Sequence, residues 1–255
     1  MKIMTGKQTR ARRILLYGPH KIGKSTWASK APGVLFADIE DGLNDLDVAK
    51  TEHLKSYADV VSCVSWLVSN SHPYQTFVID TVDWLEQLIF QQVARDASKG
   101  NIADIGYGKG YDAARAKWDF LLGGLNALRA KNVTIILLGH AKVTRFDNPE
   151  TDAYDRYDVD LHKSSCGMIE EWCDEILFAS RRVFVRTQDL GFNKERKIAA
   201  GDGERYIRTT ETPAAIAGNR LGLPAELPME WDDYAKFLPP ANVAGVVVNG
   251  SSKVA

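Results

Sequence analysis

The sequence has few cysteines, no long apolar run and almost no net charge. Its three cysteines show neither zinc-type nor C-x-x-C spacing, which argues against a disulfide or zinc framework and favours a reducing compartment. No run of 18 apolar residues and no apolar amino-terminal segment occurs, so we expect a soluble cytoplasmic protein without a membrane partner. A formal net charge of −1 excludes a global basic field that would draw the whole chain onto nucleic acid.

The composition fits one large globular domain without internal repeats, since 45% of the 255 residues are hydrophobic and 25% are charged. We expect this domain to span residues 13–238. Residues 1–12 are polar and basic, and form either a solvated tail or a contact to a phosphate backbone. Residues 239–255 show no strong pattern and are expected to be a flexible tail.

A phosphate-binding motif stands near the amino terminus. Residues 18–25 fit the pattern G-x-x-x-x-G-K-[ST], between an apolar strand at 14–17 and a helix that begins at Lys24 or Ser25. Glycines in this pattern let the backbone turn its N–H groups toward a phosphate. The predicted nucleotide-binding residues are Gly18, Pro19, His20, Lys21, Ile22, Gly23, Lys24, Ser25 and Thr26. An ordinary glycine-rich turn before a helix is the alternative.

The motif assigns separate chemical roles to its last residues. Lys24 is expected to contact the β- and γ-phosphates of ATP, and Ser25 to ligate Mg²⁺. Thr26 is a candidate for contact with the α-phosphate. ATP and Mg²⁺ are therefore the predicted cofactors.

Acidic residues follow two further apolar strands. The strand at 34–37 leads into D-I-E-D-G, where alternation places Asp38 and Glu40 on one side, and Glu40 is the candidate general base for the attacking water. The strand T-F-V-I-D at 76–80 ends in Asp80, which is expected to join Ser25 in the Mg²⁺ shell. Solvated acids at strand ends are the alternative in both places.

A further apolar strand, at 133–138, leads into Gly-His, and His140 is the candidate sensor of the γ-phosphate. Apolar spacing predicts helices at 82–97 and 112–130. Together these elements predict an α/β fold, with a mainly parallel sheet, flanking helices and late antiparallel strands at one edge. The nucleotide should bind at the carboxyl ends of the strands.

Two polar segments, predicted as loops, carry candidate contacts to single-stranded DNA. Residues 98–111 offer Tyr107 and Tyr111 for base stacking and Lys109 for a phosphate, unless the segment is only a connector. Residues 141–160 offer Arg145, although six acidic residues against three basic ones oppose simple phosphate binding there. A predicted hairpin pairs residues 194–200 with 204–209, and the basic segment 181–208 that contains it is either a nucleic-acid face or a charge-protected edge.

Four stretches together resemble the RecA-type P-loop ATPase core: G-P-H-K-I-G-K-S at 18–25, F-A-D-I-E-D-G-L at 36–43, F-V-I-D-T at 77–81 and I-I-L-L-G-H at 135–140. Glu40 occupies the place of the catalytic glutamate in RecA-like recombinases. His140 falls where those proteins usually carry a glutamine. More narrowly, the chain resembles phage-encoded Sak-type ATPases of single-strand annealing and recombination.

This resemblance implies Mg²⁺-dependent ATP hydrolysis coupled to single-stranded DNA in phage recombination, annealing or replication, in the cytoplasm of a host cell. It also implies a homo-oligomer, in which Arg220 or a basic residue of 181–208 acts in trans as an arginine finger. A single-stranded DNA-binding protein is a further expected partner. Two alternatives stay open, namely an ATPase that remodels or loads a protein partner without DNA, and a nucleotide-gated binding module without turnover.

Overall fold

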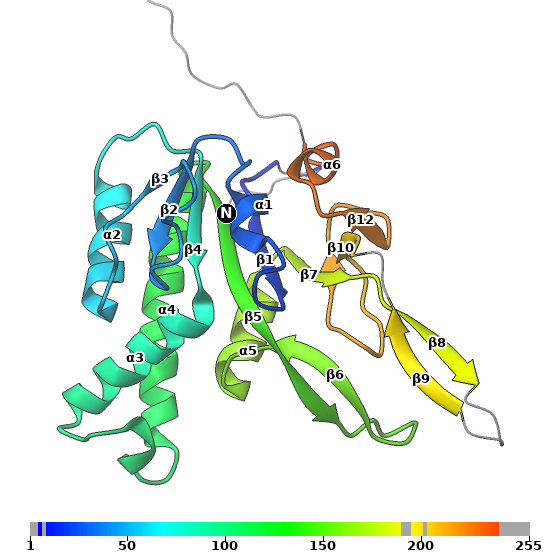
Figure 1. The fold of residues 1–255 in the computed structure, drawn as a ribbon. Helices are drawn as coiled ribbons and strands as arrows, with labels where there is room; N and C mark the ends of the chain where they lie inside the picture. The colour runs from blue at the N-terminus through cyan, green and yellow to red at the C-terminus, as the bar shows by residue number, and fades with distance from the viewer. Residues whose placement is uncertain (1–4, 7–8, 190–194, 201–202, 240–255) are drawn as a thin grey trace, which may run out of the picture.

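The fold is built on one large mixed sheet, seen in the computed structural model in Figure 1. The structure describes residues 5–6, 9–189, 195–200 and 203–239, and describes only the backbone of 184–189 and 195–200. Within these residues the sheet runs β12-β10-β7-β1-β5-β4-β2-β3, with β11 added beside β7 and β6 beside β5. The strands are β1 (Arg13–Gly18), β2 (Val34–Asp38), β3 (Ala49–Lys50), β4 (Thr76–Asp80), β5 (Thr134–Phe146), β6 (Tyr154–Val159), β7 (Glu175–Arg181), β10 (Arg205–Arg208), β11 (Gly218–Asn219) and β12 (Glu226–Pro228).

The centre of the sheet is parallel and its late edge is antiparallel. Strand β1 pairs in parallel with β5 and β7, and β4 pairs in parallel with β5 and β2. Strands β10 and β11 run antiparallel to β7, and β12 runs antiparallel to β10. The central strands are near-continuous apolar runs because both of their faces are covered. The predicted α/β fold with late antiparallel strands is therefore confirmed.

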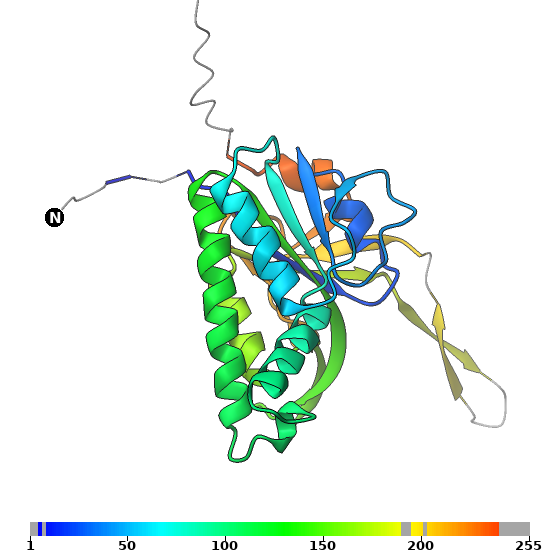
Figure 2. The same ribbon diagram turned by 90° about the vertical axis from the view of Figure 1, so that its left-hand side faces the viewer.

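Helices cover the two faces of the sheet, as Figures 1 and 2 show. The helices are α1 (Lys24–Ala28), α2 (Tyr57–Ser69), α3 (Val82–Asp96), α4 (Lys109–Ala130), α5 (Lys163–Trp172) and α6 (Trp231–Ala235), with a 3₁₀ turn at Ile102–Asp104. Alternate residues of β1 point to opposite faces, so Leu15 packs in the core beneath α2, α3 and α4, and Leu16 packs in the core beneath α1 and α6. Among the described residues, no helix combines the length and the apolar character that a bilayer crossing needs.

The segment at 141–160 is a β-hairpin, so its prediction as a loop is wrong. Strand β5 continues to Phe146, and β6 pairs with it in an antiparallel register from Ala141↔Val159 to Phe146↔Tyr154. Polar cross-strand contacts hold the two strands together: Thr144 hydrogen-bonds Asp158, and the Arg156 guanidinium lies 4.1 Å from the centre of the Phe146 ring. Strands held by polar cross-strand pairs do not need an alternating apolar pattern, and residues 141–160 therefore lack the pattern by which a strand is predicted.

The predicted hairpin between 194–200 and 204–209 is also wrong. Strand β9 (Glu195–Ala200) pairs with β8 (Phe184–Asp189), which forms a separate two-stranded ribbon. Strand β10 instead joins the main sheet beside β7. Ile207 of β10 is fully buried in the core beneath α1 and α6, and this burial draws β10 to the main sheet.

Packing begins before residue 13. Ala11 is buried, the Arg12 carbonyl accepts a hydrogen bond of 2.8 Å from the Ile135 N–H, and the Arg12 guanidinium pairs with Glu175. The end of the predicted basic tail is thus part of the domain. Of the predicted carboxyl-terminal tail, residues 240–255 lie outside the described residues.

Candidate nucleotide-binding site

The phosphate-binding motif connects β1 to α1, and both of its glycines are favoured by the local geometry. Gly23 has φ +108°, a backbone conformation that favours glycine. A Cβ on Gly18 would lie 2.4 Å from the carbonyl oxygen of Ala179 on β7, and a Cβ on Gly23 would lie 2.5 Å from Nη1 of Arg205. Glycine is therefore favoured at Gly18 by the fixed backbone carbonyl of Ala179, and at Gly23 by the positive φ, since the end of the Arg205 side chain can shift.

Lys24 lies inside the turn. Its Nζ donates hydrogen bonds of 3.1 Å to the carbonyl oxygens of Gly18 and Pro19, and the residue is buried. Burial lowers the pKa of Lys24, and the nearby carboxylates of Asp80, Asp83 and Glu40 oppose that shift in part. A buried cation that donates to carbonyl oxygens is suited to exchange them for the oxygens of a phosphate.

Ser25 and Asp80 lie together at the end of β4. The Ser25 hydroxyl donates a hydrogen bond of 2.7 Å to Oδ2 of Asp80, whose exposed fraction is only 5%. Burial raises the pKa of Asp80 to about 6, although the Ser25 hydrogen bond lowers it in part. Asp38 stands opposite Asp80 in the β2–β4 register, and its Oδ1 is buried without a hydrogen-bond partner among the described residues. Hydroxyl and carboxylate oxygens are the ligands that Mg²⁺ prefers, so these residues fit that ion.

A second polar cluster faces the motif from β5. His140 stands opposite Gly18 in the β1–β5 register, and its Nε2 lies 3.9 Å from Oε2 of Glu40. The His20 ring stacks on the His140 ring, with the ring centres 3.7 Å apart. The sequence-predicted Glu40 and His140 are therefore neighbours at the site.

Asp83, in the first turn of α3, fixes His140. Its Oδ1 accepts a hydrogen bond of 3.0 Å from the His140 N–H, and its Oδ2 lies 2.8 Å from Nδ1 of the same residue. Burial favours a higher pKa for the Asp83 carboxyl, but the hydrogen bonds and charge of His140 hold that pKa below its ordinary value. Sequence reasoning missed Asp83; its signal was an acid three residues after Asp80. Arg205 of β10, one of the basic residues of 181–208 considered only for action in trans, donates a hydrogen bond of 3.2 Å to the Ile22 carbonyl oxygen of its own chain.

Lys24, Ser25, Glu40, Asp80 and His140 line one cavity of about 390 Å³ at the carboxyl ends of the parallel strands, which we call the loop pocket. It is lined by His20, Lys21, Gly23, Lys24, Ser25, Thr26, Glu40, Gly42, Asp45, Leu46, Asp80, Thr81 and His140. Of the other predicted motif residues, Ile22 is buried in the core, and Pro19 contributes its carbonyl oxygen to Lys24. A cation, a hydroxyl, carboxylates and imidazoles thus meet in one place, as phosphoryl transfer from a nucleotide requires.

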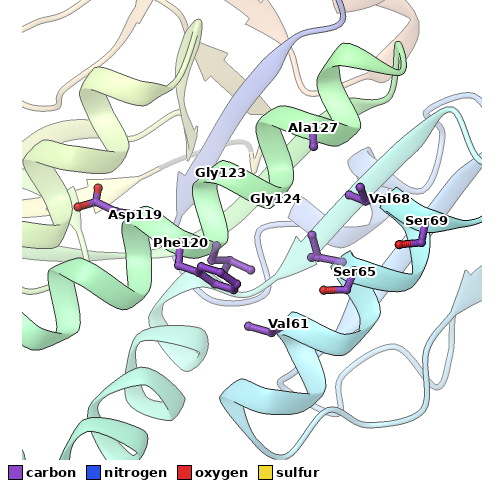
Figure 3. A pocket seen from close by; sticks show the side chains of 11 residues that line it. Val61, Ser65, Val68, Ser69, Asp119, Phe120, Gly123, Gly124 and Ala127 are labelled. Atoms are coloured by element: carbon purple, nitrogen blue, oxygen red, sulfur yellow. The ribbon is translucent and has the colours of Figure 1, made fainter.

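A second cavity, of about 440 Å³, lies between α2 and α4 and has a different character. Val61 of α2 faces Phe120 of α4 across it, and Val68 of α2 lies toward Gly124 and Ala127 of α4, as Figure 3 shows. Gly123 and Gly124 leave room on the α4 side. Its lining is mostly apolar, with Ser65, Ser69 and Asp119 as its polar side chains, and offers no cation for a phosphate, so we do not assign the nucleotide to it.

The predicted DNA contacts lie outside the loop pocket and differ in availability. Tyr107 is fully exposed, and Lys109 is exposed at the start of α4. Tyr111, by contrast, stacks on His162 with ring centres 4.1 Å apart, and also meets Phe90 edge-on. The expectation that Tyr111 offers a free ring from a loop is therefore corrected, because this residue lies in α4 and packs within the domain.

Arg145 lies on the outer part of β5, far along the hairpin. Its side chain is 69% exposed and lies 3.9 Å from a carboxylate oxygen of Asp147. The exposed Asp155 also stands opposite Arg145 in the β5–β6 register, and exposed pairs of this kind hold a side chain only weakly.

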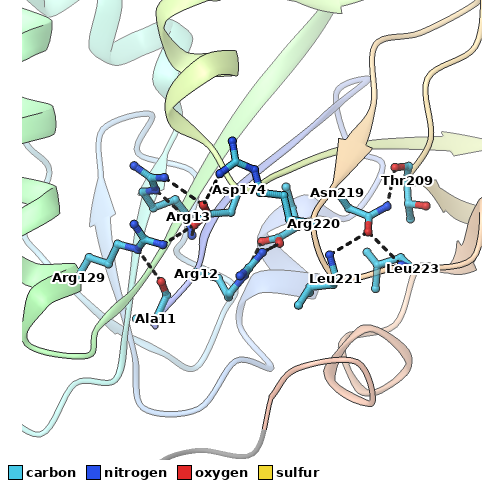
Figure 4. A network of polar contacts seen from close by, with 11 residues as sticks. Ala11, Arg12, Arg13, Arg129, Asp174, Thr209, Asn219, Arg220, Leu221 and Leu223 are labelled. Atoms are coloured by element: carbon cyan, nitrogen blue, oxygen red, sulfur yellow. Dashed lines mark hydrogen bonds and ion pairs between the residues drawn. The ribbon is translucent and has the colours of Figure 1, made fainter. Parts of the chain in front are cut away.

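Arg220 lies at the amino ends of β1 and β7, at the opposite edge of the sheet from the loop pocket. Its Nη1 is 3.8 Å from Oδ1 of Asp174, which also pairs with Arg13 and Arg129 at 3.0 Å each. Figure 4 shows this network and the Asn219 side chain, which accepts hydrogen bonds from two following N–H groups and shapes the turn. Arg220 therefore cannot serve the loop pocket of its own chain.

Comparison with known proteins gives two findings. A family model described as an AAA domain matches residues 10–221. The SPbeta prophage-derived uncharacterized protein YorG of Bacillus subtilis (strain 168) is 24% identical over 172 residues, which make up 62% of this chain and 52% of that protein. The chain spans about half the length of this relative.

Proposed function

Because the chain belongs to the AAA domain family, we propose that it is a Mg²⁺-dependent ATPase whose reaction takes place in the loop pocket. The observation that carries this proposal is the contact of 2.7 Å between Ser25 and Asp80 beside the buried Lys24. A hydroxyl and a carboxylate in contact, next to a cation, form the arrangement that binds a nucleotide triphosphate with its metal ion.

Each side chain of the loop pocket has a separate role in the proposed hydrolysis. Lys24 exchanges its two carbonyl partners for oxygens of the β- and γ-phosphates. Ser25 and Asp80 would hold Mg²⁺, which when bound neutralises charge that develops on the phosphates. Glu40, whose side chain is 30% exposed, can accept a proton from the attacking water at its carboxylate. His140, oriented by Asp83, presents Nε2 to the same space and can donate to a phosphate oxygen.

The test is the rate of phosphate release from ATP with and without Mg²⁺, for the parent chain and Ser25→Ala. We expect activity only with Mg²⁺, and its loss in the variant. Lys30→Ala is the matched control, because Lys30 is exposed just beyond α1 and outside the loop pocket. Activity that is equal in all three proteins would refute the proposal.

We propose single-stranded DNA as the polymer on which the ATPase acts, in phage recombination, annealing or replication. Two observations support this proposal: Tyr107 presents a fully exposed ring beside the exposed Lys109, and the relative with 24% identity is prophage-derived. An exposed aromatic ring next to a cation is the combination that stacks a base and pairs with its phosphate. The α3–α4 connection and the β5–β6 hairpin also lie at the same end of the molecule (Figure 1).

The DNA proposal is tested by fluorescence anisotropy of a labelled oligonucleotide, with and without a non-hydrolysable ATP analogue. We expect tighter binding with the analogue, and a salt dependence of about −0.7 in log K per neutralised phosphate. Tyr107→Ala should weaken binding by ~1–3 kcal/mol if it stacks one base. Trp66→Ala, which removes a half-exposed ring from α2, is the control.

A protein-remodelling ATPase is the second candidate, and the charge of the β5–β6 hairpin favours it. Residues 141–160 carry six acidic and three basic side chains, a balance that repels a phosphate backbone. ATPase activity that is present but unaffected by any nucleic acid, in a chain that binds no oligonucleotide at low salt, would select this function over the first.

We further propose that the ATPase acts as a homo-oligomer in which Arg220 serves the loop pocket of a neighbouring subunit. The position of Arg220 at the far edge of the sheet supports action in trans. Mixing Arg220→Ala subunits with Lys24→Ala subunits should restore part of the activity that each lacks alone, because mixed interfaces pair an intact pocket with an intact arginine. No recovery in mixtures that form oligomers would refute this role.

A further inference from the structure

We propose that His20, Glu40 and His140 form a binding site for a transition-metal cation of the Zn²⁺ class, separate from the Mg²⁺ position at Ser25 and Asp80. One ligand atom from each of the three residues lies within 4.8 Å of the other two. No other group of three or more such side chains in the described part of the chain meets this geometry. The inference does not depend on ATP hydrolysis, since it concerns the protein without nucleotide.

The spacing of the ligand atoms is close to that of a tetrahedral ion. At Zn–N and Zn–O distances of about 2.0–2.2 Å, two ligand atoms lie about 3.4 Å apart. The His140 Nε2 and Glu40 Oε2 are 3.9 Å apart and all three ligand atoms lie within 4.8 Å of one another, so closing on an ion requires movements of about 0.5–1.4 Å, in which the His20 ring leaves its stack on the His140 ring. His20 is exposed and Glu40 is partly exposed, so both can make this adjustment around the buried His140.

Asp83 prepares His140 for this role. Its carboxylate lies 2.8 Å from Nδ1 of His140, which directs Nε2 of the ring toward Glu40. A carboxylate that holds the far nitrogen of an imidazole is the usual outer support of a histidine metal ligand. The backbone N–H of His140 also donates to Asp83, so the ring is held at two points.

The ligand set selects the class of metal. Two imidazoles and one carboxylate suit Zn²⁺, Cu²⁺ or Ni²⁺, whereas Mg²⁺ prefers oxygen ligands and retained waters. Three protein ligands leave a fourth position for water or another small ligand, as in sites that are open to a pocket. The open side here is the loop pocket.

The test follows the five histidine side chains by ¹H–¹⁵N NMR during titration with ZnCl₂, using the untagged full chain without nucleotide or Mg²⁺. We expect the His20 and His140 ring signals to shift and to saturate at one equivalent. His53 and His72 lie outside the cluster and should not shift, and they serve as internal controls.

Affinity is then measured by competition with a chromophoric chelator. Glu40→Gln and His20→Ala should each weaken Zn²⁺ binding at least ten-fold, and Asp83→Asn about 10–100-fold. His53→Ala should bind like the parent, and thermal melting shows whether each variant is folded. His20 is exposed, so its replacement keeps the test informative even if a variant at a buried position unfolds.

The outcomes separate this inference from the proposed ATPase. Histidine shifts confined to His20 and His140 support the site even in a chain that hydrolyses no ATP. Shifts spread over His53 and His72, no saturable binding, or equal affinity in folded His20→Ala and parent protein would overturn it even where ATPase activity is normal.

Discussion

The buried carboxylate of Asp80 should make the stability of the protein depend on pH in a direction opposite to that of most acids. Burial raises its pKa from 3.8 to about 6. Between these values the folded protein retains a proton that the unfolded chain has released, so the free energy of unfolding falls as pH rises through this window. A difference of about two pKa units corresponds to a cost of ~3 kcal/mol above pH 7, as an order of magnitude.

Asp80→Asn removes the charge and nearly keeps the shape, so it should remove this cost. We expect the variant and the parent to be similarly stable at about pH 3.5, below both pKa values, and the variant to be more stable at pH 7.5. Urea denaturation without Mg²⁺ or nucleotide at several pH values measures the difference in midpoint. Asp119→Asn, at an exposed position on α4, is the control and should show no such trend.

The same variant also tests the metal assignment. Without the Asp80 carboxylate, hydrolysis should require a higher Mg²⁺ concentration, and nucleotide affinity should change less. A stability difference that is constant from about pH 3.5 to 7.5 would refute the burial argument. If the Mg²⁺ dependence of hydrolysis is the same in Asp80→Asn as in the parent chain, Asp80 is not a Mg²⁺ ligand.

Three further substitutions have defined outcomes. Lys24→Ala should abolish ATP binding in a chain that still melts cooperatively, and normal affinity in the folded variant would contradict the loop assignment. Glu40→Gln should keep ATP bound but slow single-turnover hydrolysis by ~10²–10⁴-fold, and a change of only a few-fold would transfer the base role to another group. Gly18→Ala should cost ~1–3 kcal/mol of stability because its Cβ meets the Ala179 carbonyl, whereas Gly42→Ala, which has open space, should cost far less in urea denaturation.

The order of motifs along the chain was enough to predict the α/β fold. Parallel strands that are buried on both faces are apolar runs, and the strands around Leu15, Val78 and Ile136 show this pattern. Parallel strands also bring their carboxyl ends to one edge. The residues at or just after the carboxyl end of each strand, including Asp80 and Glu40, could therefore be expected in one pocket without knowledge of any long-range contact.

Side-chain pairs that join distant segments were not predictable in this way. Asp83 contacts His140 across 57 positions of sequence, and Arg205 contacts Ile22 across 183. Neither pair has a local pattern, since each depends on which strands become neighbours. The pairing of β10 was predicted wrongly for the same reason. Ile207 becomes buried beside β7 only in the assembled sheet, and no local pattern announces this.

Ion pairs within the β5–β6 hairpin account for its three basic side chains but leave its net negative charge unchanged. A count of its acids predicts repulsion of DNA, yet three of these acids lie in ion pairs, namely Asp147 with Arg145, Asp158 with Arg156 and Asp160 with Lys142. The pairs use all three cations of residues 141–160, so the hairpin keeps an excess of three negative charges, from six acids and three bases. This charge disfavours phosphate binding at the hairpin, and the α3–α4 connection, which lies at the same end of the molecule (Figure 1), carries the exposed Tyr107 and leads to the exposed Lys109. If Tyr107→Ala binds single-stranded DNA with the same affinity as the parent chain, the contact does not lie at Tyr107.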